Sequence, residues 1–107
     1  MSDIKHAATK NLIAALWQRS QPTVLERLDV LDRAAVAAAS DLLTQDLRAQ
    51  ATDTAHKLAG SLGMFGFHEG TGYAGEIEVL LESPGLNAVV LSALTSQLRQ
   101  ALFPVNL

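Results

Sequence analysis

The 107-residue chain contains no cysteine, and aromatic residues make up only 5% of it. The lack of cysteine excludes a disulfide framework and a metal site built on thiolates. So few aromatic side chains provide no stacking platform for single-stranded nucleic acid. No apolar run approaches the roughly 20 residues of a membrane-spanning helix, and the N-terminal sequence MSDIKHAATK lacks the order of a signal peptide. We therefore expect a cytoplasmic protein with no membrane segment.

Positive charge is also scarce. Eight Lys and Arg residues are scattered among eleven Asp and Glu residues, for a formal net charge of −3. Nucleic-acid binding needs a cluster of basic residues to displace counterions, so we expect no nucleic-acid partner. Hydrophobic residues account for 49% of the chain, too many for a disordered protein. The length predicts a single domain over residues 1–107.

The apolar residues that are present recur with a helical period, and no run alternates as in a β-strand. Two stripes carry this period, one of Val24, Leu28, Leu31, Ala35 and Ala38, the other of Val90, Leu94, Leu98 and Ala101. Proline, glycine and polar residues divide the pattern into a short N-terminal helix that ends at 20–22 and helices at about 22–39, 45–62, 68–81 and 86–103. The short connections predict an all-α, antiparallel up-and-down four-helix bundle with a short additional N-terminal helix.

The third of these helices, with Thr44 as its expected N-cap, contains the sequence AHKLAGSLGMFGF at residues 55–67. On a helical wheel of 100° per residue, Leu47, Ala51, Ala55 and Leu62 lie within about 60° of Leu58. His56 lies about 160° away from Leu58, so the pattern predicts a buried apolar stripe and an exposed imidazole.

The predicted neighbours of His56 on the outer face are small. They are Ala49, Thr52, Asp53, Ala59, Gly60 and Gly63. Neutral imidazole is a competent nucleophile near pH 7, and an absence of long side chains suits a nucleophile that a second protein has to reach. The same pattern also fits an ordinary surface histidine, or a face on which another helix packs.

The quoted sequence resembles the signature of histidine-containing phosphotransfer (Hpt) domains, approximately A-H-x-L-K-G-S-x-x-x-x-G. The matching residues are Ala55, His56, Leu58, Gly60, Ser61 and Gly66. Downstream, Ala74, Ile77 and Glu78 stand where the family tends to place a small residue and then Leu-Glu. Length and helix count agree too, so the resemblance covers most of the chain.

The resemblance implies that His56 accepts a phosphoryl group and exchanges it with aspartates of response-regulator receiver domains. It implies a hybrid sensor histidine kinase as a further partner, and Gly60 as the position that lets a receiver approach. It also implies a monomeric carrier without kinase activity or a cofactor of its own, the Mg²⁺ being held by the receiver.

Two features depart from the family pattern. The family usually places a lysine beside the phosphoryl group three residues after the histidine, where this chain has Ala59. Lys57 is the candidate for a replacement charge, although it lies about 100° around the helix from His56. Gly70 stands where leucine is frequent and, with Gly72 and Gly75, is expected to loosen the start of the fourth helix.

Several other residues have more than one interpretation. Asp53 could orient the imidazole or simply be solvated. Met64, Phe65 and Phe67 could close one end of the core or form a rim beside His56, while Gly63 and Gly66 are expected to end the helix and turn the chain. His6 and His68 are expected to be ordinary surface residues, and a metal site on His56 and His68 lacks a third ligand.

Two rival functions stay open at this point. The chain could be an interaction module that docks a receiver or kinase without carrying phosphate, which the missing lysine at Ala59 favours. It could also be a phosphoacceptor domain of the chemotaxis-kinase type, which differs in the protein that supplies the phosphoryl group. The sequence contains no phosphate-binding Gly-Lys-Ser/Thr loop and no Gly-x-Ser-x-Gly motif that would indicate an enzyme.

Overall fold

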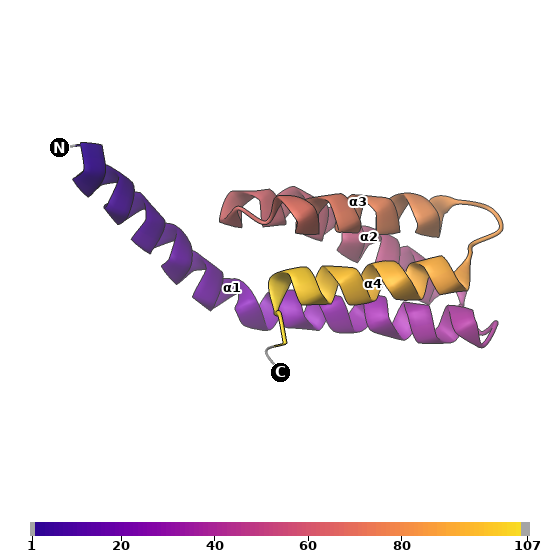
Figure 1. The fold of residues 1–107 in the computed structure, drawn as a ribbon. Helices are drawn as coiled ribbons and strands as arrows, with labels where there is room; N and C mark the ends of the chain where they lie inside the picture. Colours follow the sequence, from indigo (N-terminus) through magenta and orange to yellow (C-terminus); the bar gives the residue numbers. More distant parts are fainter. Residues whose placement is uncertain (1, 106–107) are drawn as a thin grey trace.

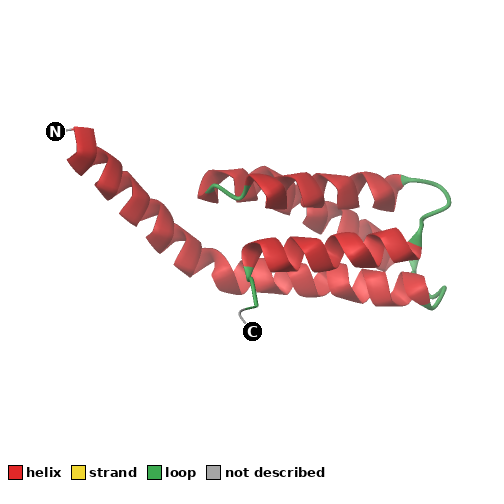
Figure 2. Ribbon diagram, in the orientation of Figure 1, coloured by secondary structure: helices red, strands yellow, loops and turns green. Residues whose placement is uncertain are grey.

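The computed structural model describes residues 2–105, and it describes side chains from residue 8 onward, so that the side chain of His6 lies outside the described residues. Residues 2–105 form helices and loops and no β-strand (Figure 2). The helices are α1 (Ser2–Ala39), α2 (Gln45–Leu62), α3 (His68–Glu82) and α4 (Ala88–Leu102), with a 3₁₀ turn, η1 (Gly63–Phe65), after α2. The predicted all-α bundle is confirmed.

The four helices pack as an up-and-down bundle in which α1 also contacts α4 and so closes the ring (Figure 1). The predicted stripe on α1 is confirmed at Val24, Leu28, Leu31 and Ala35, all of which are buried. The predicted stripe on α4 is wrong at Val90, which is 42% exposed. The buried positions of α4 are Leu91, Thr95, Leu98 and Leu102. Because apolar residues surround the start of α4, their pattern alone does not determine which side faces the core.

The predicted break between a short first helix and a second helix at Pro22 is wrong. Pro22 lies inside the continuous helix α1, whose N-terminal half leaves the bundle at an angle (Figure 1). Proline removes one helical hydrogen bond and crowds the preceding turn, which can bend a helix without ending it. Trp17, on the N-terminal side of Pro22, packs against three aromatic rings at one end of the bundle. These contacts hold this part of α1 against the bundle. The ring centroids lie 5.4 Å from Phe65, 4.7 Å from Phe67 and 5.5 Å from Phe103.

The loops at the two ends of α2 follow the predicted signals. The Thr44 hydroxyl oxygen accepts a hydrogen bond from the Leu47 amide at 3.1 Å, so the predicted N-cap is confirmed. After η1, Gly66 adopts a left-handed φ of +84°, which turns the chain towards α3 as predicted. The Phe65 and Phe67 rings pack on Trp17, whereas Met64 is 68% exposed.

The glycines of α3 do not share one explanation. A Cβ atom on Gly70 would lie 3.1 Å from a Leu102 methyl carbon and 3.3 Å from a Leu62 methyl carbon. Leu62 and Leu102 are the last residues of α2 and α4. Glycine at position 70 therefore lets α3 pack closely against the ends of these two helices, and it does not simply loosen α3. A Cβ atom on Gly72 or Gly75 would meet nothing within 4 Å, and nothing in the structure explains why glycine stands there.

Candidate functional site

His56 lies on the outer face of α2, opposite the core. Ala51, Ala55, Leu58 and Leu62 are buried on the inner face, as the helical wheel predicts. The side chain of His56 is 73% exposed. The predicted exposure of the imidazole is therefore confirmed, and the buried stripe beneath it fixes the direction in which the ring points.

The surface beside His56 on α2 is formed mainly by small side chains. Ala49, Asp53 and Gly60 are exposed, and Thr52 and Ala59 are half-buried. A Cβ atom on Gly60 would meet nothing within 4 Å, so glycine is not required there by packing within this chain. The absence of a side chain at Gly60 instead leaves free space one helical turn after His56.

Glu78 of α3 holds the imidazole of His56. The Nδ1 atom of His56 lies 2.9 Å from Oε2 of Glu78, and the Glu78 side chain is 24% exposed. Because a carboxylate only accepts hydrogen bonds, Nδ1 carries the proton and donates it to Glu78. In the neutral ring this leaves the lone pair on Nε2, which is the nitrogen available to a reacting group.

On the sequence alone Asp53 could orient the imidazole or be solvated, and in the structure its exposed carboxylate pairs with Lys57. The Lys57 Nζ atom lies 2.9 Å from Oδ2 of Asp53. The hydrogen bond and charge of Lys57 lower the pKa of the exposed Asp53 carboxyl, with smaller contributions from His56 and Arg27. Lys57 thus points towards the preceding turn of α2.

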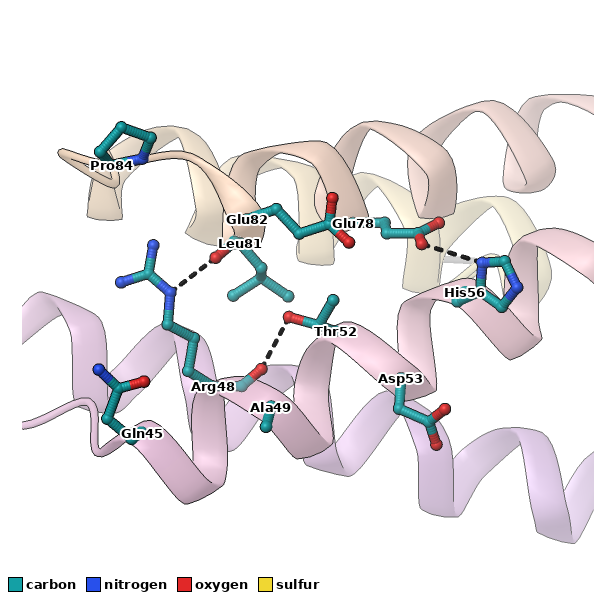
Figure 3. A pocket seen from close by; sticks show the side chains of 10 residues that line it. All are labelled: Gln45, Arg48, Ala49, Thr52, Asp53, His56, Glu78, Leu81, Glu82 and Pro84. Atoms are coloured by element: carbon teal, nitrogen blue, oxygen red, sulfur yellow. Dashed lines mark hydrogen bonds and ion pairs between the residues drawn. The ribbon is translucent and has the colours of Figure 1, made fainter.

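His56 stands at one end of a groove between α2 and α3, called here the His56 groove (Figure 3). Its lining residues are Gln45, Arg48, Ala49, Thr52, Asp53, His56, Glu78, Leu81, Glu82 and Pro84. Towards the other end, Arg48 reaches from α2 to α3, and its Nε and Nη2 atoms donate to the carbonyl oxygens of Leu81 at 2.6 Å and Ser83 at 2.7 Å. These bonds satisfy carbonyl groups at the C-terminus of α3 and tie α3 to α2.

The Hpt domain family matches residues 15–102, which is most of the chain and includes His56. The chain belongs to the Hpt family. Hpt domains are phosphotransfer carriers of two-component signalling that interact with receiver domains and kinases in phosphorelays. Comparisons with curated proteins and with solved structures give no significant match.

The residues of the Hpt signature divide into a buried set and an exposed set. Ala55 and Leu58 are fully buried and place α2 in the bundle, whereas His56 and Gly60 face outward. Ala59, where the family usually has lysine, is half-buried against the core. Among the described residues, no group of three or more His, Cys, Asp or Glu side chains could hold a metal ion. Nor does any described helix have the length and apolar character needed to cross a membrane.

Proposed function

We propose that His56 of this Hpt domain accepts a phosphoryl group on Nε2 from the aspartyl phosphate of a receiver domain and returns it to such an aspartate. One observation carries the proposal. The exposed imidazole has its Nδ1 atom held by Glu78 at 2.9 Å, which directs the lone pair of Nε2 away from α3 and into solvent. The exposed histidine is also the one that the family signature marks, which supports this proposal.

The transfer needs only positioning and charge stabilisation. The Nε2 lone pair attacks phosphorus, the aspartyl oxygen–phosphorus bond breaks, and its electron pair remains on the aspartate carboxylate. The proton on Nδ1 stays in the hydrogen bond to Glu78, whose negative charge stabilises the positive charge that develops on the ring. The reverse transfer follows the same path.

The remaining machinery is expected in the partners. In this proposal the receiver holds the Mg²⁺, a hybrid sensor histidine kinase supplies the phosphoryl group upstream, and the monomeric cytoplasmic carrier has no kinase activity or cofactor. Gly60 provides the space that the receiver needs beside His56. Lys57 is the residue that the sequence offers as a charge on the phosphate side, but its ammonium group is paired with Asp53, and the proposal gives it no part in the transfer.

Transfer from a phosphorylated receiver tests this function. We expect the chain to gain a label that is stable in base and labile in acid, and His56→Gln to gain none. If the wild-type chain binds the receiver but takes up no label, it is the interaction module instead. If a kinase labels it directly and no receiver does so, it is a phosphoacceptor domain of the chemotaxis-kinase type.

Glu78→Gln is expected to slow phosphoryl uptake from a receiver about tenfold. A tenfold change corresponds to about 1.4 kcal/mol, close to the value of one charge-assisted hydrogen bond. We also expect the ¹⁵N chemical shifts of His56 to show loss of the preference for a protonated Nδ1. Glu82→Gln, in the same groove, is the matched control and should change neither quantity. Equal rates for the wild type and Glu78→Gln would contradict the positioning role of Glu78.

A further inference from the structure

The side chains nearest to a phosphoryl group on His56 along α2 include a negative charge and no positive one. On a helix, the side chains that neighbour a residue are those three and four positions away. For His56 these are Thr52, Asp53, Ala59 and Gly60. They include one anion and no cation, so α2 offers a doubly negative phosphoryl group no opposite charge at its nearest positions.

The facing helix adds negative charge. Glu78 and Glu82 of α3 line the His56 groove. The one cation among the groove-lining residues is Arg48, and it is eight positions from His56, about 12 Å along the helix axis. Its guanidinium is already bonded to the carbonyl oxygens of Leu81 and Ser83, so Arg48 is held at the far end of the groove.

Two further cations, Lys57 and Arg27, act on Asp53. Lys57 is adjacent to His56 in sequence, and consecutive residues of a helix do not face each other. Its Nζ atom is 2.9 Å from Asp53. Arg27 of α1 contributes to the lowered pKa of Asp53 and lies outside the lining of the groove.

We infer that this chain carries phosphohistidine at His56 without a cation of its own, and that Ala59 thereby shifts the exchange equilibrium towards the aspartate of the receiver. The inference rests on the proposed function. A dianion without a nearby positive charge has a higher free energy than one that is paired, and the docked receiver then has to supply that charge. The domain is accordingly suited to passing its phosphoryl group on rather than storing it.

Ala59→Lys tests this inference, because it places an ammonium group one helical turn after His56. Ala59 is half-buried, and a lysine can extend its charged end from such a position into solvent. We expect the ratio of phosphohistidine to phosphoaspartate, at equilibrium with a receiver, to rise about three- to tenfold. After labelling with phosphoramidate, ³¹P NMR titration should show a lower pKa for the phosphoryl group in Ala59→Lys than in the wild type.

Two control variants separate charge from other effects. Ala59→Gln adds a long side chain without charge and should leave the ratio and the phosphoryl pKa as in the wild type, as should Lys57→Gln. The inference is overturned if Ala59→Lys behaves like Ala59→Gln, or if Lys57→Gln lowers the ratio and raises the phosphoryl pKa. If neither phosphoramidate nor a receiver labels His56 of the wild type, the proposed function itself fails, and that result is distinct from both.

Discussion

Replacing Gly60 with tyrosine is expected to lower phosphoryl transfer from a receiver domain at least tenfold, while labelling by phosphoramidate continues at the wild-type rate. A Cβ atom at position 60 meets no other group within 4 Å, so the substitution should not disturb the bundle. The tyrosine ring would occupy the surface one turn after His56 that a protein partner has to approach. A small phosphoryl donor needs no such surface and can still reach Nε2.

Gly72→Tyr is the matched control for this prediction. Gly72 is also a helical glycine with open space at the Cβ position, but it lies on α3 outside the His56 groove. We expect it to leave both transfer from the receiver and labelling by phosphoramidate unchanged. Normal transfer from the receiver to Gly60→Tyr would show that the partner does not approach over Gly60.

Leu58→Ala is expected to reduce the free energy of unfolding by about 2–5 kcal/mol, because it removes a large side chain from a packed core and leaves a cavity. Leu58 is fully buried and lies on the face of α2 opposite His56, so it helps to fix the orientation of the helix. Urea denaturation followed by circular dichroism measures the change. Leu12→Ala, at a leucine that is 62% exposed, should change stability far less. A loss below about 1 kcal/mol for Leu58→Ala would contradict the assigned core.

The sequence predicted α2 more accurately than α1. The signals for α2 are local: Thr44 caps its first turn, and the buried stripe has one phase along its whole length. Pro22 was a misleading signal, because whether a helix ends or bends at proline depends on what holds its two sides. Here the contacts of Trp17 with the aromatic rings of the bundle hold the N-terminal side, and they join residues that are far apart in sequence.

At the site, too, the sequence predicts what depends on one helix and misses what depends on the packing of two helices. The exposure of His56 follows from the period of one helix. Its contact with Glu78 spans 22 residues and depends on how α3 packs against α2. Spacing within one helix could offer only Asp53 for this role, with solvation of Asp53 as the alternative. The pair of Asp53 and Lys57 stands at positions i and i+4, a spacing that by itself indicates a helical ion pair and could have been recognised from the sequence.

The central claim, that His56 carries the phosphoryl group on Nε2, is tested most directly by locating that group on the protein. After transfer from a phosphorylated receiver, mass spectrometry identifies the labelled residue and heteronuclear NMR identifies the nitrogen bonded to phosphorus. We expect one phosphoryl group on Nε2 of His56, with the proton retained on Nδ1. A phosphoryl group on Nδ1 or on another residue would contradict this claim, as would undiminished labelling of the His56→Gln variant.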